Sequence, residues 1–300
     1  MMTISVASGK GGAGKTSIAA ALASTLGEDC VFADCDVDAA NGAIALGARI
    51  GSREPYFAGP GYMILPSACT GCGRCHEVCR FNAIEPVAGA KEFRIIPELC
   101  ERCGACVDTC PTGAITNFEK QAGELFVSIS RTGTELVHAE LEPGEDTSGK
   151  LVALVRKRAA TLAAAIAPDG AVMVVDAPPG IGCPVIASIT GCDLVLVVVE
   201  ASASGVRDAG RLVELVQSMK RRSVAIINKT GLNATMDESA RRMLSTAGIP
   251  IAGEIPFDPA LRSAEEANLT WATVKCGSAG RIQAALVAMH GVITTIKEKQ

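Results

Sequence analysis

The stretch Gly9-Lys10-Gly11-Gly12-Ala13-Gly14-Lys15-Thr16 decides the fold, because it fits the phosphate-binding pattern G-x-x-x-x-G-K-[ST]. It follows an alternating apolar segment, Thr3–Ser8, and opens a helical pattern that runs from Lys15 to about Leu26. Glycines let consecutive backbone N–H groups curl around phosphate oxygens, and the helix presents the positive end of its dipole to the same anion. A strand, a glycine-rich loop and a helix in this order predict a nucleotide site.

Individual side chains of this loop have expected roles in binding a nucleoside triphosphate. Lys15 can reach the β- and γ-phosphates, and the Thr16 hydroxyl can ligate Mg²⁺. The alternative is a coincidental glycine turn, which the flanking strand and helix disfavour. The residues expected to bind the phosphates are Gly9, Lys10, Gly11, Gly12, Ala13, Gly14, Lys15, Thr16 and Ser17.

The rest of the chain alternates between buried strands and helices, except in one segment. Short apolar runs at 30–33, 171–175, 194–199 and 224–227 suit parallel strands covered on both faces. Helical patterns lie between and after them, at about 151–166, 206–219, 237–247 and 279–297, and Gly27 is expected to end the first helix. This alternation of strands and helices predicts an α/β fold with a doubly wound, mostly parallel sheet formed by residues 1–65 and 120–300.

The segment 66–119 has a different composition, rich in Cys, Gly and Pro, and is predicted to be a small inserted α+β domain. Eight of the 13 cysteines fall between positions 69 and 110. No signal peptide is visible at residues 1–8, so the cluster indicates metal ligation in a reducing cytoplasm instead of disulfides. About 50 residues are too few for a conventional core, which also points to an inorganic component.

These cysteines form two copies of C-x2-C-x2-C-x3-C, beginning at Cys69 and Cys100. The spacing resembles that of bacterial two-cluster ferredoxins, where three close cysteines bind one cluster and the fourth binds the other. The resemblance assigns one [4Fe–4S] cluster to Cys69, Cys72, Cys75 and Cys110, and a second to Cys79, Cys100, Cys103 and Cys106. A zinc site, the alternative, would use two C-x2-C pairs or a mixed S/N set.

One position departs from the ferredoxin pattern. Pro111 follows the last cysteine of the second copy, whereas Arg80 follows that of the first. Proline shapes a turn and is no ligand, so both clusters are still expected, although loss of one cluster stays open. A nearby cation such as Arg80 would raise the reduction potential of a cluster.

Lys10 is a second lysine inside the phosphate loop, and here the chain resembles the MinD/ParA ATPases with a "deviant Walker A" loop. The resemblance implies an ATP-bridged homodimer in which Lys10 reaches the partner's nucleotide; the alternative is a solvated lysine. Residues 34–41 resemble the family's switch I, which implies that Asp36 positions the attacking water and contacts the Mg²⁺ shell. Asp34 is then a structural or Mg²⁺-side carboxylate, and Asn41 a polar prop.

Two more sites complete the expected nucleotide pocket. Residues 174–180 resemble switch II, and Asp176 at the end of a buried strand is expected on the Mg²⁺ side, unless it only caps a helix. Asn228, Pro256 and Asp258 occupy positions where related ATPases hold adenine, and ordinary turn chemistry is the alternative. The catalytic set is therefore Lys10, Lys15 and Asp36, with Thr16, Asp36 and Asp176 at magnesium.

Several features carry no predicted site. Cys183 and Cys192 are expected to be buried structural thiols, although related proteins bridge a cluster across their dimer near this region. His76 is expected to be solvated. Basic clusters at 156–158, 220–222 and 241–242 indicate solvated helix faces or a docking patch, because the net charge of −4 disfavours nucleic acid. The apolar set of the last helix suits packing on the sheet, so a membrane tail is not expected.

Along its whole length the chain thus resembles MinD-superfamily P-loop ATPases that carry an inserted ferredoxin domain. The resemblance implies Mg²⁺-dependent ATP hydrolysis, slow without a stimulating partner, beside two [4Fe–4S] clusters. Three roles stay open: electron transfer gated by ATP, positioning or assembly switched by ATP with structural or sensing clusters, and maturation or delivery of a metallocluster. The redox or assembly partner protein is not identified by the sequence.

Overall fold

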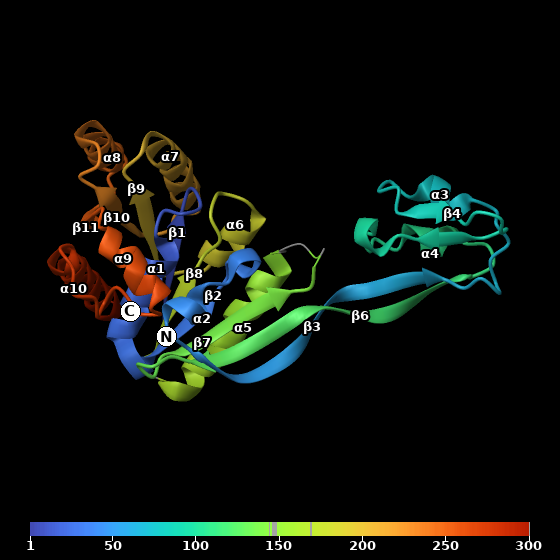
Figure 1. Cartoon of the computed structure of the whole chain (residues 1–300), viewed down its shortest axis with the longest axis horizontal. Coiled ribbons are helices and arrows are strands. Elements are labelled where there is room, and N and C mark those ends of the chain that lie inside the picture. Colours follow the sequence, from blue (N-terminus) through green and yellow to red (C-terminus); the bar gives the residue numbers. More distant parts are fainter. Residues whose placement is uncertain (144, 146–148, 169, 300) are drawn as a thin grey trace. The chain divides into compact units, whose positions relative to one another are not determined.

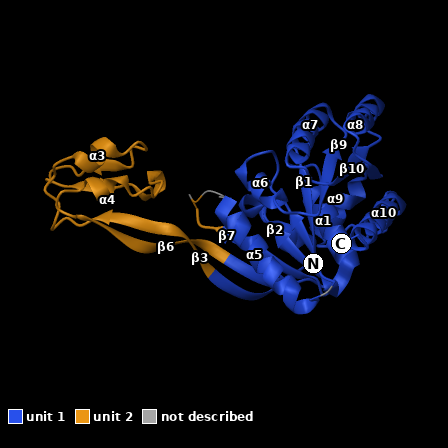
Figure 2. Cartoon of the chain, turned by 180° about the vertical axis from the view of Figure 1, so that it is seen from behind, with its two compact units in different colours: residues 1–54, 125–140, 147–300 blue, residues 55–124, 141–146 orange. Residues whose placement is uncertain are grey.

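The computed structural model describes residues 1–143, 145, 149–168 and 170–299, and the chain forms two compact units (Figure 2). The first unit comprises residues 1–54, 125–140 and 147–300, and the second comprises 55–124 and 141–146. The predicted insert, 66–119, lies within the second unit. Within the described residues, no helix is both long enough and apolar enough to span a membrane.

The first unit is built on one large sheet with the strand order β11-β10-β9-β1-β8-β2-β7-β6-β3 among the described residues. The pairs β1–β8, β1–β9, β9–β10, β10–β11, β2–β8 and β2–β7 are all parallel, which confirms the predicted mostly parallel α/β fold. Strands β3 and β6 are long and continue into the second unit. The strand bounds are β1 Met2–Ser8, β2 Cys30–Asp34, β3 Arg49–Ile64, β6 Ile115–Ile129, β7 Glu135–Leu141, β8 Val172–Asp176, β9 Leu194–Glu200, β10 Ser223–Thr230 and β11 Ile251–Pro256.

Helices cover both faces of the parallel part of the sheet (Figure 1). Helices α1 (Lys15–Leu26), α9 (Pro259–Glu266) and α10 (Ala279–Lys297) share one apolar core with Ile4 and Val6 of β1. Helices α6 (Cys183–Ile189), α7 (Ala203–Ser218) and α8 (Ala234–Thr246) share the opposite core with Ala7. Each fully buried Val, Leu or Ile contributes roughly 1.5–3 kcal/mol, so a strand buried on both faces is strongly fixed.

Helix α5 (Gly149–Ile166) packs on β2, β8 and α6, and the short helix α2 (Gly42–Ala45) packs on α1. The described residues also form the 3₁₀ turns η1 (Gly27–Asp29), η2 (Val37–Ala39) and η3 (Pro97–Leu99). Gly27 has a positive φ of 68° at the end of α1, as predicted for its role there. Two helices begin about three residues earlier than predicted, because the Ser202 and Asn233 side chains cap them by accepting backbone N–H bonds.

The second unit repeats its backbone as it repeats its sequence. Helices α3 (Arg74–Val78) and α4 (Ala105–Thr109) pack together, and each follows a left-handed glycine, Gly73 or Gly104, whose φ is 78°. Strands β4 (Ile84–Pro86) and β5 (Phe93–Ile95) form an antiparallel pair. The small core of this unit contains Cys75 and Cys106 side by side with Ile84 and Ile115.

The topology of the first unit gathers polar residues at one edge. Because parallel strands end on the same side of a sheet, the segments that follow β1, β2, β8, β9, β10 and β11 meet there. The phosphate loop, Asp36 and Asp258 lie there, together with Asp34, Asp176, Glu200 and Asn228 near the ends of their strands.

Candidate functional site

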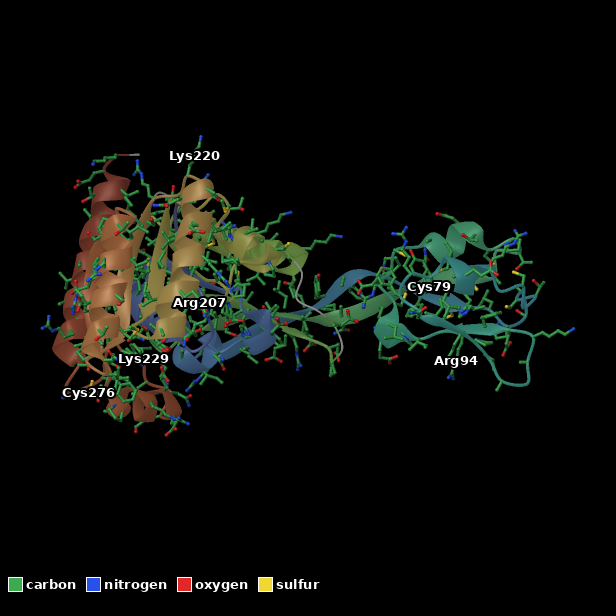
Figure 3. All side chains as sticks on the ribbon, turned by 90° about the horizontal axis from the view of Figure 1, so that it is seen from above. Cys79, Arg94, Arg207, Lys220, Lys229 and Cys276 are labelled. Atoms are coloured by element: carbon green, nitrogen blue, oxygen red, sulfur yellow. The ribbon has the colours of Figure 1, made fainter. Side chains whose placement is uncertain are left out.

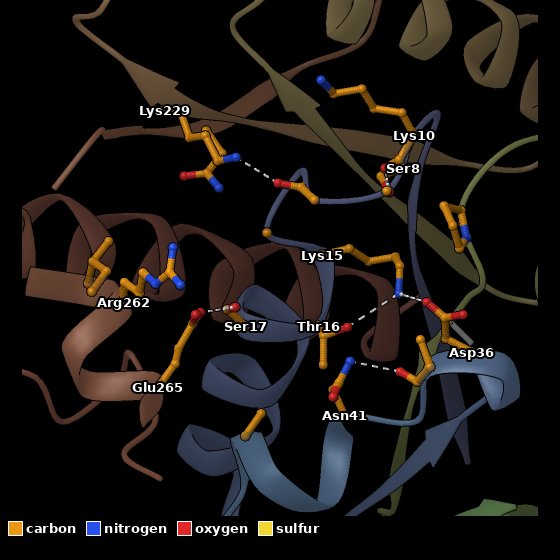
Figure 4. Close-up of a pocket in the computed structure, with 18 of the residues that line it drawn as sticks. Ser8, Lys10, Lys15, Thr16, Ser17, Asp36, Asn41, Lys229, Arg262 and Glu265 are labelled. Carbon is orange, nitrogen blue, oxygen red and sulfur yellow. Dashed lines mark hydrogen bonds and ion pairs between the residues drawn. The ribbon is translucent and has the colours of Figure 1, made fainter. Parts of the chain in front are cut away.

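A pocket of about 1130 Å³ opens at this edge of the sheet (Figure 4). The phosphate loop forms its floor, the 36–45 segment one wall, and the start of α9 another. Of the residues expected to bind nucleotide or Mg²⁺, the lining includes Lys10, Gly11, Gly12, Gly14, Lys15, Thr16, Ser17, Asp36, Asn228, Pro256 and Asp258.

The loop keeps its shape because two of its glycines lie against other parts of the chain. A Cβ on Gly9 would lie 2.2 Å from the backbone of Asp208 in α7. Gly14 has a φ of 88°, and a Cβ there would lie 2.3 Å from Nδ2 of Asn228. That amide nitrogen donates a 2.8 Å hydrogen bond to the carbonyl oxygen of Ala13. Asn228 was predicted as an adenine contact. From β10, two strands away from β1, it also fixes the phosphate loop.

A buried lysine links the loop to two of the predicted magnesium carboxylates. Lys15 Nζ lies 2.6 Å from Asp176 Oδ1 and 3.4 Å from Asp36 Oδ2, and the Thr16 hydroxyl donates to Asp176 Oδ2 at 2.6 Å. The Lys15 and Asp176 side chains are only 6% and 0% exposed. Burial disfavours the ammonium, but the surrounding carboxylates outweigh it and raise the pKa of Lys15. Oxygen donors of this kind are what Mg²⁺ prefers.

Asp34 serves as an anchor for the loop that carries Asp36. Its Oδ1 accepts the backbone N–H of Asp36 at 3.1 Å, and its Oδ2 accepts that of Gly42 at 2.8 Å. Complete burial, followed by the charge of Asp176, raises the pKa of Asp34. Of the two roles that the sequence left open for Asp34, these contacts support the structural one.

The loop itself carries Asp36 and Asn41 on its pocket side. Burial raises the pKa of Asp36, although the nearby Lys15 ammonium opposes this shift. Asn41 donates through Nδ2 to the carbonyl oxygen of Ala39 at 2.9 Å, so it stabilises the turn η2 (Figure 4).

Lys10 is held by a carboxylate that sequence reasoning missed. Its Nζ lies 2.7 Å from Oε1 of Glu200, and Lys229 Nζ lies 2.9 Å from Oε2 of the same residue. Lys229 also donates to the carbonyl oxygen of Gly12 at 2.7 Å. Burial alone would raise the pKa of Glu200, but hydrogen bonds from the two lysines and Ser202 lower it. Its signal in the sequence is the one that identified Asp176, an acidic residue ending a buried strand.

The wall expected to hold adenine is built around Asp258. One carboxylate oxygen accepts the backbone N–H of Ala260 and the other that of Ser278, both at 3.0 Å. These bonds lower the pKa of Asp258, the bond from Ala260 most. Both oxygens of Asp258 therefore bind backbone N–H groups of the chain. This agrees with ordinary turn chemistry, the alternative to adenine binding at this position. Pro256 precedes it in the same wall.

Two further residues of this wall were not predicted. Trp271, the only tryptophan, is 7% exposed, and its ring lies 3.4 Å from the position of a Cβ on Gly14. Its Nε1 is buried without a hydrogen-bond partner among the described residues. The Ser17 hydroxyl donates to Glu265 Oε1, which joins α1 to α9 across the pocket (Figure 4). The sequence could not indicate Trp271, because a single aromatic residue outside the motifs forms no pattern.

The second unit contains two small cavities, each lined by four cysteines. Cys69, Cys72, Cys75 and Cys110 line one, and Cys79, Cys100, Cys103 and Cys106 line the other. The crossing of the fourth cysteine between the repeats is therefore present in the folded chain. Figure 3 marks Cys79 in this unit.

The two cavities have matching hydrogen bonds to sulfur. Backbone N–H groups of Ala83 and Ala114 donate to the Sγ atoms of Cys79 and Cys110, each at 3.3 Å. Among the described residues, no three His, Cys, Asp or Glu side chains converge as ligands of one metal ion. A [4Fe–4S] cluster needs another arrangement, because each cysteine binds a different iron at a different corner. Four thiols around a cavity, with N–H donors to sulfur, fit such a cluster.

Outside these sites the predictions for other residues have mixed outcomes. Cys192 is buried as predicted, and burial raises the pKa of its thiol to about 11. The prediction is wrong for Cys183, which begins α6 with its side chain exposed. Arg156 is not a solvated cation, because it donates to the Ala187 carbonyl oxygen and to Cys192 Sγ. Arg241 forms an ion pair with Glu254 through two hydrogen bonds, and these bonds raise the pKa of Arg241.

The fold and the loop together define a P-loop nucleotide-binding protein. The chain belongs to the family described as the CobQ/CobB/MinD/ParA nucleotide binding domain, which it matches over residues 4–271. It is 34% identical over 241 residues to uncharacterized protein MJ0578 of Methanocaldococcus jannaschii, covering 78% of this chain and 80% of that protein.

Solved structures share the fold of this chain. The MinD cell division protein of Aquifex aeolicus has a TM-score of 0.57 at 18% identity, covering 97% of this chain and 98% of that one. The septum site-determining protein MinD of Pyrococcus horikoshii, complexed with Mg-ADP, has a TM-score of 0.59 at 14% identity, covering 98% of both chains. At these identities the likeness concerns the fold alone.

The position of Trp271 against the phosphate loop gives a direct optical test of the pocket. We expect its fluorescence to change saturably when the protein is titrated with Mg²⁺ and ADP, since any change must come from the only tryptophan. Trp271→Phe should lose the signal and keep binding measured by calorimetry, because a ring still covers Gly14. Binding seen by calorimetry without any change in wild-type emission would show that the nucleotide lies elsewhere.

Proposed function

We propose that this chain is an ATP-binding and ATP-hydrolysing protein in which a nucleotide-dependent homodimer is coupled to two [4Fe–4S] clusters that transfer electrons. The observation that carries the proposal is the pair of cysteine-lined cavities, divided between the repeats in the crossed pattern of two-cluster ferredoxins. The deviant Walker A loop and its carboxylates supply the nucleotide half of the function.

In the proposed nucleotide site the loop amides and Lys15 bind the β- and γ-phosphates, which compete with Asp176 for the ammonium. Thr16, Asp36 and Asp176 hold Mg²⁺, whose charge would neutralise that developing on the phosphates. Asp36 orients the attacking water, and its contact with Lys15 keeps it on the pocket side. Asn228, Pro256 and Trp271 shape the site of the base.

The dimer half of the proposal rests on Lys10. Its side chain is 28% exposed and lies beside the phosphate loop, held by Glu200 of its own chain. In the dimer it would exchange this carboxylate for a phosphate of the partner's nucleotide, an interaction between full charges. The two ATP molecules would then bridge the subunits.

In the proposed redox half, the four cysteines of each cavity hold one [4Fe–4S] cluster, which carries a single electron when bound. The N–H groups of Ala83 and Ala114 stabilise the thiolate ligands. Eight thiolate ligands persist in a reducing compartment, which supports a cytoplasmic location. A redox protein that exchanges electrons with these clusters is the expected partner.

A second candidate is an ATP-switched positioning or assembly factor with structural or sensing clusters. The observation in its favour is the likeness of fold to MinD, one of whose structures is a MinC:MinD complex from Aquifex aeolicus, and to the McdA proteins of Cyanothece. It differs from the first candidate in leaving the cluster potentials independent of nucleotide.

The cluster ligands are tested by iron and acid-labile sulfide analysis after anaerobic reconstitution. We expect about eight of each per wild-type chain and about four in Cys79→Ser, because one of two cubes loses a ligand. Cys276→Ser, outside the cavities, is the matched control and should keep about eight. Bound zinc without sulfide in the wild type would refute the cluster proposal.

The role of Lys10 is tested by sedimentation of the protein with Mg²⁺ and a non-hydrolysable ATP analogue. We expect Lys10→Ala to bind the analogue and to dimerise at least about tenfold more weakly, since a charge-assisted bond across the interface contributes roughly 1.5–3 kcal/mol. Lys220→Ala, an exposed lysine away from the pocket, should dimerise like the wild type (Figure 3). Equal dimerisation of all three proteins would remove Lys10 from the interface.

A further inference from the structure

One ion-pair network of the second unit involves a residue that lies far along the sequence from the cysteines. Glu145 follows β7 and forms ion pairs with Arg102 and with Lys120, the latter at 2.8 Å. The Glu145 and Arg102 side chains are only 10% and 16% exposed. Burial opposes the charge of Glu145, but hydrogen bonds from Lys120 and Arg102 lower its pKa.

Arg102 itself occupies an unusual backbone position. It lies between Cys100 and Cys103, it lines the same cavity as these cysteines, and its φ is +55°. Side-chain-bearing residues rarely adopt this left-handed conformation, and they keep it only where their surroundings hold them there.

The internal repeat shows that an arginine at this position is not needed for the turn. The equivalent position of the first repeat, between Cys69 and Cys72, is Gly71, whose φ is +70°. Glycine adopts this conformation without strain, and a Cβ on Gly71 would lie 2.8 Å from the backbone of Lys91. The second repeat therefore carries a strained cation where the first has no side chain. Arg80 directly follows Cys79 in the sequence but is not among the residues that line this cavity.

We propose that Glu145 is a positioning residue that fixes the Arg102 guanidinium beside the cluster held by Cys79, Cys100, Cys103 and Cys106, and thereby raises that cluster's reduction potential above the other's. The inference rests on the proposed function, because it needs both clusters. A fixed cation favours the reduced form of a cluster, which carries one more negative charge. The cluster beside Gly71 then donates electrons to the cluster beside Arg102.

Glu145 also lies close in sequence to a helix of the first unit. Four residues after Glu145 the chain begins α5 at Gly149, where an added Cβ would lie 3.8 Å from the carbonyl oxygen of Cys183 and 3.7 Å from Ala187. Both belong to α6, which follows the loop after Asp176. The residue that holds Arg102 is thus close in sequence to a helix packed against the segment that follows Asp176.

The test is an anaerobic redox titration of the full chain followed by EPR, with both clusters present. We expect Arg102→Gly, which copies the first repeat and relieves the left-handed strain, to lower the midpoint potential of one cluster and leave the other unchanged. We expect Glu145→Gln to lower the same potential, because the released arginine moves away from the cluster. Glu145→Asp, which keeps the charge, should restore at least part of it.

The sign of the change in midpoint potential in Glu145→Gln distinguishes a positioning role of Glu145 from a direct effect of its negative charge on the cluster. Loss of the Glu145 charge with Arg102 still in place would raise the potential, so a rise or no change in Glu145→Gln overturns the proposal. Glu142→Gln, an exposed glutamate three residues earlier, is the matched control and should titrate like the wild type. Two intact clusters with unchanged potentials in all variants would contradict this inference alone, whereas a wild type without two clusters would overturn the proposed function with it.

Discussion

The buried ion pair between Lys15 and Asp176 is the interaction on which the nucleotide site depends. Its two atoms lie 2.6 Å apart between two almost fully buried side chains, and Thr16 donates to the other oxygen of the same carboxylate. A buried charge must be paired, so the loop after β1 and the end of β8 cannot separate without a large cost. Asp34 and Asp36, at the end of β2, complete the group of charges.

The ion pair between Lys15 and Asp176 also means that a bound phosphate would compete with a carboxylate for the lysine ammonium. The same ammonium that satisfies Asp176 is the group expected to bind phosphates, so nucleotide and carboxylate compete for it. Glu200 stands in the same relation to Lys10. Both lysines are therefore held in their own chain by carboxylates that end buried strands, and both are available to an incoming anion.

The parts that followed from the sequence are those in which local pattern and topology agree. The glycine-rich loop specifies a strand and a helix on either side, and the apolar runs specify parallel strands, so Asp36 and Asp176 had to meet although 140 positions separate them. The resemblance to two-cluster ferredoxins implied the crossed cysteine sets, and the cysteines line the two cavities in those sets.

The parts that did not follow depend on contacts that no local pattern records. Trp271 reaches Gly14 through the packing of the last helices, and Glu145 reaches Arg102 through the return of the chain after β7. Cys183 was expected to be a buried structural thiol, but it begins a helix with its side chain exposed. The ion pair between Lys10 and Glu200 likewise depends on β1 and β9 lying side by side in the sheet.

The central claim of this account is that the nucleotide site and the clusters share free energy. It is tested most directly by an anaerobic EPR redox titration of the reconstituted wild type, with and without Mg²⁺ and a non-hydrolysable ATP analogue. The account predicts that the analogue shifts the midpoint potential of one cluster by several tens of millivolts. Superimposable titration curves would contradict it and would leave the clusters as structural or sensing groups of an ATP-switched assembly protein.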